Sequence, residues 1–131
     1  MRRASSRRAG HEPANPALVE AFGSACSSGD RDRLAALLSE DVRVVVDSGG
    51  VLAGTEVPAF GMREALDLIG AALRTPLCEL EPRSINGTTG LLGRRDGAVV
   101  AAVLLDADDA LIRDVWIVLG TDKLAHWNRV D

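Results

Sequence analysis

Asp47 and Asp114 are the residues of this 131-residue sequence that are best suited to acid–base chemistry. Asp47 follows a run of valines and precedes residues 48–50, whose Ser-Gly-Gly sequence predicts a turn. At the mouth of a hollow fold, this carboxylate would act as a general base. The alternative is that Asp47 only accepts hydrogen bonds from the amides of the turn, and the sequence leaves both interpretations open.

Asp114 lies in a mostly apolar run over residues 111–119, which we expect to form a strand. Strict alternation along that strand predicts that Asp114 shares a face with Ile112, Trp116 and Val118. If this face lines a cavity, Asp114 is a second catalytic carboxylate beside Trp116. If it does not, Asp114 is solvated and pairs with an arginine.

Three further residues are candidates for ligand binding. Trp116 is an aromatic platform for an apolar ligand, and the alternative is a place in the core or in a dimer contact. Val118 would line the same cavity. Asn86 is followed by Gly87 in a hairpin signal, so it is a turn residue first and a hydrogen-bond donor to a ligand second.

Other kinds of chemistry lack the residues they need. The two histidines, His11 and His126, stand far apart in the chain, and no Cys-x-x-Cys or His-x-x-x-His pattern provides a metal site. No glycine-rich loop followed by a lysine predicts phosphate binding. Cys26 and Cys78 lie in apolar patterns, which favours buried free thiols over a disulfide or a nucleophile. We therefore expect no metal and no cofactor.

Length and composition indicate the class of protein. A chain of 131 residues forms one core, and 47% hydrophobic but only 3% aromatic residues predict a core of Ala, Val, Leu and Ile. Such small side chains fill a curved sheet incompletely, so we expect a cavity. Residues 13–131 carry 11 basic and 18 acidic side chains, and this acidic body argues against direct binding of nucleic acid.

The first residues form a basic segment. Four arginines lie within residues 1–12, and we expect residues 1–15 to be a disordered tail ahead of a domain over residues 16–131. No apolar segment follows these arginines, as a signal peptide would require, and no stretch approaches the ~18 apolar residues that span a membrane. We therefore expect a cytoplasmic protein that does not bind membranes.

Periodicity predicts three helices in the first part of the domain. Asn15 is a suitable N-cap for the first helix, because a proline and apolar residues at helical spacing follow it. Asp30 caps a short second helix. A strand over residues 42–47 comes next, and Gly61 precedes a third helix.

The rest of the chain predicts strands joined by hairpins. Asn-Gly at residues 86–87 and Asp-Gly at residues 96–97 are strong hairpin signals. Because sequential hairpins require antiparallel pairing, we expect an antiparallel sheet that ends in the strand over residues 111–119. The predicted fold is α+β, a cone-shaped barrel in which three N-terminal helices pack on a curved antiparallel sheet.

Three short motifs resemble one group of proteins. They are Asp-Ser-Gly-Gly at residues 47–50, Ser-Ile-Asn-Gly at residues 84–87 and Gly-Thr-Asp-Lys-Leu at residues 120–124. The C-terminal domain of extracytoplasmic-function sigma factors related to SigJ has similar motifs, an Asp-Gly-Gly-Gly type loop, a Val-Asn-Gly and an Asn-Pro-Asp-Lys-Leu. The phrase "SGDRDRLAALLSEDV" resembles the opening of the SnoaL-like branch of the nuclear transport factor two superfamily, and the resemblance covers residues 16–127.

This resemblance implies a SnoaL-like cone that modulates a sigma factor, although the sigma region that binds polymerase and promoter is not in this sequence. The superfamily also includes ketosteroid isomerase, polyketide cyclases and limonene epoxide hydrolase, whose catalysis uses a carboxylate in the cone. Asp47 falls close to the position of an isomerase-like base. The sequence departs from the sigma-factor motifs at Ser48 and at residues 120–121, and it has no tyrosine to assist a base.

We therefore predict a non-catalytic SnoaL-like module, homodimeric through its sheet, which regulates a sigma factor or another protein or binds a small apolar ligand. The alternative is a cyclase, isomerase or hydrolase acting on a polyketide- or terpenoid-like substrate, with Asp47 as base and Asp114 or Trp116 assisting. An enzyme requires a closed pocket into which at least two polar groups converge, whereas a regulatory module requires only an exposed face.

Overall fold

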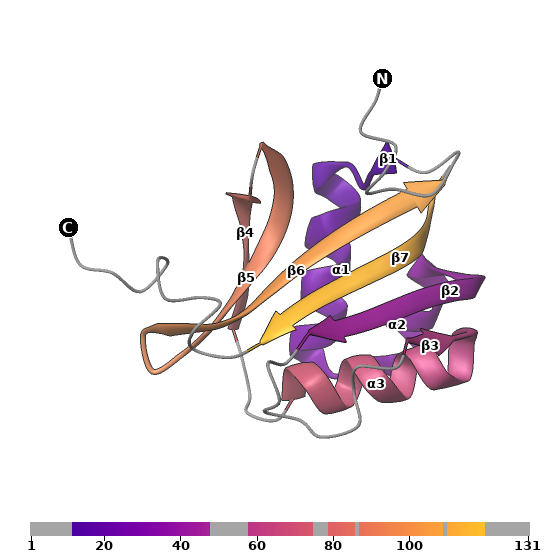
Figure 1. The fold of residues 1–131 in the computed structure, drawn as a ribbon, viewed down its shortest axis with the longest axis horizontal. Helices are drawn as coiled ribbons and strands as arrows, with labels where there is room; N and C mark the ends of the chain where they lie inside the picture. The colour runs from indigo at the N-terminus through magenta and orange to yellow at the C-terminus, as the bar shows by residue number, and fades with distance from the viewer. Residues whose placement is uncertain (1–11, 48–57, 75–78, 86, 109, 120–131) are drawn as a thin grey trace.

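The computed structural model describes residues 12–47, 58–74, 79–85, 87–108 and 110–119, which form three helices and seven strands (Figure 1). The helices are α1 (Pro16–Ser28), α2 (Arg31–Leu37) and α3 (Met62–Arg74). The strands are β1 (Glu12–Pro13), β2 (Leu38–Asp47), β3 (Ala59–Phe60), β4 (Glu79–Ile85), β5 (Thr88–Arg95), β6 (Ala98–Asp108) and β7 (Leu111–Leu119). The order of the longer elements is the one that the sequence predicts.

The first two helices begin where the sequence predicts. The Asn15 side chain accepts a hydrogen bond from an α1 backbone N–H at 2.8 Å, and Pro16 occupies the first turn, where its missing N–H costs nothing. Gly29 ends α1 in the left-handed conformation, with φ 71°. Asp30 then caps α2, because its carboxylate accepts a hydrogen bond from the Arg33 N–H at 3.0 Å.

The folded domain begins before the first helix. Glu12 and Pro13 form β1, which pairs antiparallel with β6, and Ala14 is buried. The Ala14 N–H donates a hydrogen bond to the Leu105 carbonyl at 2.9 Å. Residues 12–15, which the sequence assigns to the tail, are therefore part of the domain, and the expected disordered segment over residues 1–11 lies outside the described residues.

The strands form one sheet in the order β3-β2-β7-β6-β5-β4, and β1 pairs with β6. The predicted hairpins join β4 to β5 and β5 to β6 as antiparallel pairs. In the second hairpin, Asp96 and Gly97 have φ values of 54° and 84°, the left-handed conformations that a two-residue hairpin turn requires.

The pair β2–β7 departs from the predicted antiparallel pattern, because these two strands run parallel (Figure 1). A hairpin connects only strands that are neighbours in the chain, and β2 and β7 are not neighbours. The long segment between them, which contains α3 and the hairpins, returns the chain to the edge of β2 in the same direction. The sheet is therefore mixed, although most of its pairs are antiparallel.

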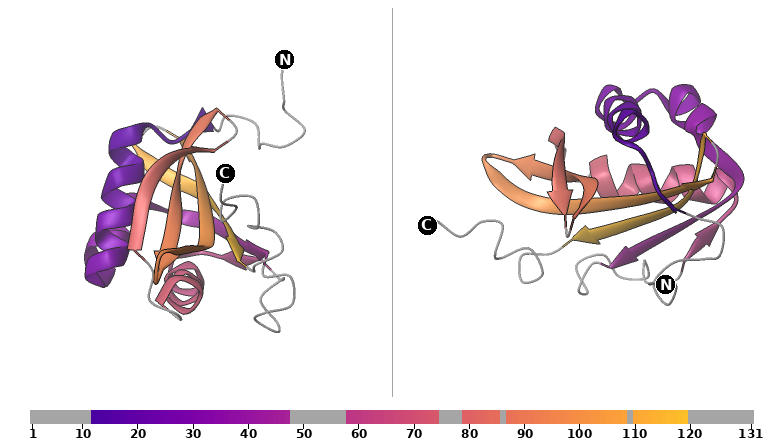
Figure 2. Two further views of the ribbon diagram at one scale, coloured as in Figure 1. Left: turned by 90° about the vertical axis from the view of Figure 1, so that its left-hand side faces the viewer. Right: turned by 90° about the horizontal axis from the view of Figure 1, so that it is seen from above.

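The helices cover one face of this sheet (Figure 2). Helix α1 packs against β4 and β5, and α3 packs against β2 and β3. Phe22 of α1, Val44 of β2 and Ile117 of β7 lie at the centre of the main core, each 0% exposed. Phe22 is the one aromatic side chain of this core within the described residues, which agrees with the small aliphatic core predicted from composition.

Candidate functional site

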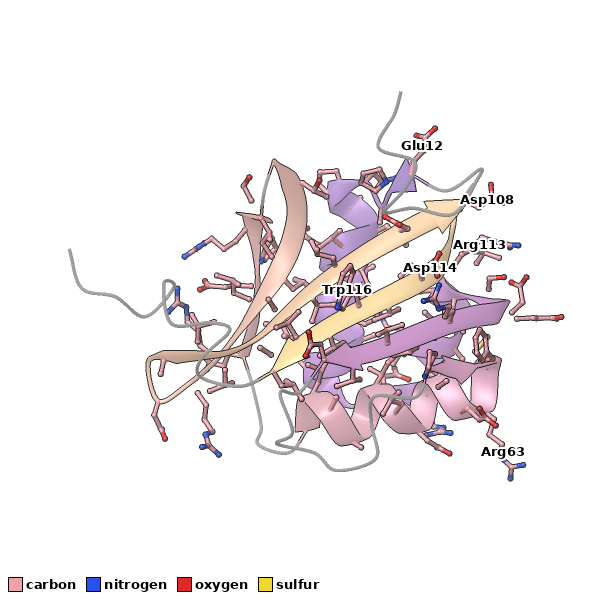
Figure 3. All side chains as sticks on the ribbon, in the orientation of Figure 1. Glu12, Arg63, Asp108, Arg113, Asp114 and Trp116 are labelled. Carbon is pink, nitrogen blue, oxygen red and sulfur yellow. The ribbon has the colours of Figure 1, made fainter. Side chains whose placement is uncertain are left out.

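A β-bulge in β7 decides which of its side chains share a face. Asp114 pairs with Asp106, but Ile112 pairs with the adjacent Ala107, so Arg113 is an extra residue between them. Ile112 is buried in the main core, whereas Asp114 lies on the other side of β7 (Figure 3). The predicted alignment of Ile112 with Asp114 is therefore wrong, because strict alternation does not continue across a bulge.

Arg113 connects this bulge to the start of β2. Its guanidinium donates a hydrogen bond to the Ser39 hydroxyl at 3.1 Å and forms an ion pair with Asp41 at 3.1 Å. An oxygen of Asp108 lies 3.9 Å from the guanidinium. Ser39 is only 5% exposed, so its hydroxyl must find partners within the protein. Sequence reasoning missed this cluster, since an arginine in a strand gives no signal that distinguishes it from a solvated one.

The face of the sheet opposite the helices, which we call the helix-free face, carries Val45, Trp116 and Leu104 side by side on β2, β7 and β6. Trp116 is 48% exposed. Phe60 of β3 and Leu111 of β7 also point to this side, and they are 60% and 40% exposed. The large hydrophobic side chains that are exposed within the described residues therefore all lie on one face.

A small apolar cluster continues the helix-free face toward β4. It contains no helix residue, and its members are Ile85, Leu92, Val99 and Ala102, with Leu104 and Val118 packed against them. Beyond it, the Glu81 carboxylate pairs with Arg94 at 2.6 Å and with Arg83 at 3.3 Å. The hydrogen bond from Arg94, assisted by the positive charge of both arginines, lowers the pKa of Glu81.

Both candidate catalytic carboxylates lie on the helix-free face. Asp47 ends β2 in register with Val118, and Asp114 is in register with Arg43, four positions earlier on β2. Four strand positions correspond to about 13 Å of backbone, which separates the two carboxylates along the sheet. Of the ligand candidates, Trp116 lies between the two carboxylates, Val118 lies beside Asp47, and Asn86 lies outside the described residues.

A pocket of about 180 Å³ lies among the three helices, away from this face. Its lining residues are Ala25, Cys26, Gly29, Asp30, Arg31, Leu34, Leu66, Ile69, Gly70 and Leu73. None of the candidate residues predicted from the sequence lines this pocket. Cys26 is a free cysteine, as predicted, and burial raises the pKa of its thiol to about 12, which keeps the thiol uncharged at neutral pH.

The part of the chain that the structure describes contains no candidate metal centre. Within residues 12–47, 58–74, 79–85, 87–108 and 110–119, no three His, Cys, Asp or Glu side chains come together as metal ligands. Of the helices in these ranges, none combines the length and the apolar character that crossing a membrane requires.

Comparison with known proteins identifies the fold. No protein-family model matches the chain, and no curated protein matches its sequence. Among solved structures, the extracytoplasmic function sigma factor SigJ from Mycobacterium tuberculosis has a TM-score of 0.63 and 21% sequence identity, over 86% of this chain and 44% of SigJ. The chain therefore spans less than half the length of SigJ.

Two further structures are similar over nearly their whole length. A SnoaL-like protein of unknown function from Burkholderia thailandensis E264 has a TM-score of 0.59 and 15% identity, over 82% of this chain and 99% of that protein. A provisionally named ketosteroid isomerase from Kribbella flavida DSM 17836 has a TM-score of 0.57 and 19% identity, over 88% of each chain. The chain has the SnoaL-like, nuclear transport factor two-like fold that its sequence motifs predicted.

Proposed function

We propose that this chain is a non-catalytic regulatory module that forms a homodimer, in which the helix-free face of one copy docks on the helix-free face of the other. The observation that carries the proposal is the exposure of Trp116. This side chain is 48% exposed and lies between Val45 and Leu104 in an apolar strip across the helix-free face. Contiguous exposed apolar surface with a polar rim is typical of protein–protein contacts, and tryptophan is prominent among the residues that dominate their energy.

The charges of the helix-free face support a second copy as the occupant. In a symmetric dimer the same patch serves both subunits, so the patch must complement itself. On β2, Arg43 and Asp47 lie two positions to either side of Val45, the register partner of Trp116. A two-fold axis that crosses the strands at Val45 brings Arg43 of each copy opposite Asp47 of the other, which pairs opposite charges around an apolar centre.

The positions of the two candidate carboxylates support a non-catalytic role. A catalytic pocket needs at least two polar groups that converge where water is excluded. Asp47 and Asp114 are spread along a partly exposed face, and neither lines the described pocket among the helices. The similarity to SigJ, a sigma factor, is the reason to propose regulation, and it is an argument from shared fold.

Sedimentation equilibrium of the full chain tests the dimer. We expect the unaltered chain to be a dimer at micromolar concentration and Trp116→Glu to be a monomer, because the new carboxylate would be buried against an apolar partner. Ala36→Glu, which adds the same charge on the exposed side of α2, is the matched control and should remain a dimer. A monomeric unaltered chain, or a dimeric Trp116→Glu variant, would contradict the proposed interface.

A complementation experiment tests the regulatory role against the enzymatic alternative. The phenotype of a gene deletion should be restored by Asp47→Asn but not by Trp116→Glu if contact through the helix-free face is the function. An enzyme that uses Asp47 as its base would give the reverse result for Asp47→Asn. Because Asp47 also lies opposite Arg43 in the proposed dimer, sedimentation must first show that the Asp47→Asn protein is still a dimer. A dimeric Asp47→Asn protein that fails to complement would overturn the non-catalytic proposal.

A further inference from the structure

The pocket among the helices has a buried floor and an open rim. Its floor consists of aliphatic side chains that are nearly inaccessible to solvent, which are Ala25, Leu34, Leu66, Ile69 and Leu73. They come from three different helices, so the space between them is a gap in helix packing. Its rim is formed by Gly29, Asp30 and Arg31 at the junction of α1 and α2, and these residues are exposed.

We infer that this pocket is a binding site for a small, uncharged, largely apolar molecule about the size of one six-membered ring. Its volume of about 180 Å³ slightly exceeds the ~150 Å³ of engineered apolar cavities that stay dry and bind benzene. The aliphatic floor gives water few hydrogen-bond partners, so an apolar molecule that displaces water from the floor gains free energy. The site is separate from the helix-free face, and the inference does not depend on the proposed dimer.

The charges at the rim explain why the ligand should be uncharged. Arg31 already forms an ion pair with Asp67 at 2.8 Å, and Asp30 lies on the same rim. The guanidinium at the rim is therefore already paired with a carboxylate, and Asp30 beside it gives an anion no further attraction. A cation would have to leave water for an aliphatic floor that has no carboxylate among its residues, so it is disfavoured as well.

Cys26 is the one sulfur atom of the lining and a useful reporter for the site. Its thiol is uncharged at neutral pH, so the wall remains apolar and the ligand is held without a covalent bond. A molecule in the pocket would cover this thiol. Binding should therefore slow the reaction of Cys26 with a small thiol reagent such as methyl methanethiosulfonate, measured in a Cys78→Ser background that leaves a single cysteine. The reaction is followed at alkaline pH, because the raised pKa of Cys26 makes the thiol slow to react near neutral pH.

Titration of the isotope-labelled full chain with fluorobenzene tests the inference directly. We expect saturable chemical-shift changes in the methyl groups of Leu34, Leu66 and Ile69, and slower modification of Cys26 at the same fluorobenzene concentrations. If saturating fluorobenzene moves none of these resonances and does not protect Cys26, the inference is wrong. This measurement uses the unaltered pocket, so it does not depend on whether any pocket variant folds.

Filling the pocket provides a second test. Cys26→Phe or Leu66→Phe should weaken fluorobenzene binding by about tenfold or more, because the added ring occupies the space of the ligand. Trp116→Glu, on the far face, should leave the binding unchanged. Binding that survives in a folded pocket-filling variant would overturn the inference, whereas a monomeric chain that still binds fluorobenzene would contradict only the proposed dimer.

Discussion

The two faces of the sheet use the same strands but meet different surroundings. On the covered face, Val44, Val103 and Ile117 are fully buried beneath the helices. On the helix-free face, their chain neighbours Val45 and Trp116 are half-buried or exposed. Alternate residues of one strand therefore serve separate purposes, since one set holds the domain together and the other set is available for contact. The role of a polar or aromatic residue in a strand therefore depends on which face of the sheet it occupies.

The largest expected effect concerns the covered face. Phe22→Ala should lower the free energy of unfolding by about 3–5 kcal/mol, because it removes the largest side chain of the core and leaves a cavity between α1 and the sheet. Urea unfolding followed by circular dichroism measures this change. Trp116→Ala is the matched aromatic truncation on the helix-free face, and it should cost less than about 1 kcal/mol at concentrations where the chain is monomeric. Equal losses of unfolding free energy in the two variants would show that the two faces contribute equally to the stability of the domain.

A glycine tests whether the helix-free face has tight packing of its own. A Cβ atom at Gly90 would lie 2.7 Å from the Val103 carbonyl oxygen and 2.8 Å from the Ile85 Cδ1 atom. Gly90→Ala should therefore lower the free energy of unfolding by about 1–3 kcal/mol, measured by urea unfolding. Thr89→Ala, at the preceding position of the same strand, is the control and should change the free energy of unfolding by less than about 0.5 kcal/mol. If Gly90→Ala leaves the free energy of unfolding unchanged, the side chains around Ile85 rearrange at little cost.

Arg113 is the extra residue of the bulge that decides which face of the sheet each β7 side chain occupies. Arg113→Met should cost about 1 kcal/mol, because the Ser39 hydroxyl loses a charged partner while the ion pair to Asp41 is already partly screened by solvent. Amide hydrogen exchange should become faster at Ile112 and at neighbouring positions of β7. Unchanged exchange there would show that the bulge persists without the guanidinium.

The smallest expected effect lies at the edge of the helix-free face. Arg94→Gln should raise the pKa of Glu81 toward 4.5, because the main cause of its lowered pKa is the hydrogen bond from Arg94. A lowered carboxyl pKa contributes stability above pH 4.5 that is lost as the pH falls through the folded-state value. The variant should therefore lose less stability than the parent chain in that acidic range. Carboxyl carbon shifts followed by NMR during an acid titration measure the pKa, and an unchanged value would exclude Arg94 as the cause.

Local features of the fold could be predicted from the sequence because their signals are local. Asn15 and Asp30 cap helices through contacts only three residues away, and Asp96-Gly97 makes a turn that depends on its own backbone conformations. The parallel β2–β7 pair could not be predicted this way, because its strands lie far apart in sequence. Periodicity and hairpin signals predicted three helices on an antiparallel sheet, and the SnoaL-like resemblance indicated which known fold this arrangement belongs to.

The candidate site was harder to predict for two physical reasons. The first is the bulge at Arg113, which reverses the face of Ile112 relative to Asp114 without any glycine or proline to mark it. The second is that the pocket around Cys26 is a gap between three helices, so it depends on tertiary packing. Alternation along β7 did identify Trp116 and Val118 as residues of one face, but it could not say that this is the face without helices.

The parallel pairing of β2 with β7 also has a consequence for how the chain reaches its native state. Arg43 pairs with Asp114, about 70 positions later, so the β2–β7 pair forms only after a long loop closes, which slows folding. During synthesis on a ribosome, β2 emerges long before its partner. Its valine-rich edge is then open to pairing with other nascent chains until β7 arrives. We therefore expect chains truncated before residue 111 to aggregate, with β2 as the segment responsible.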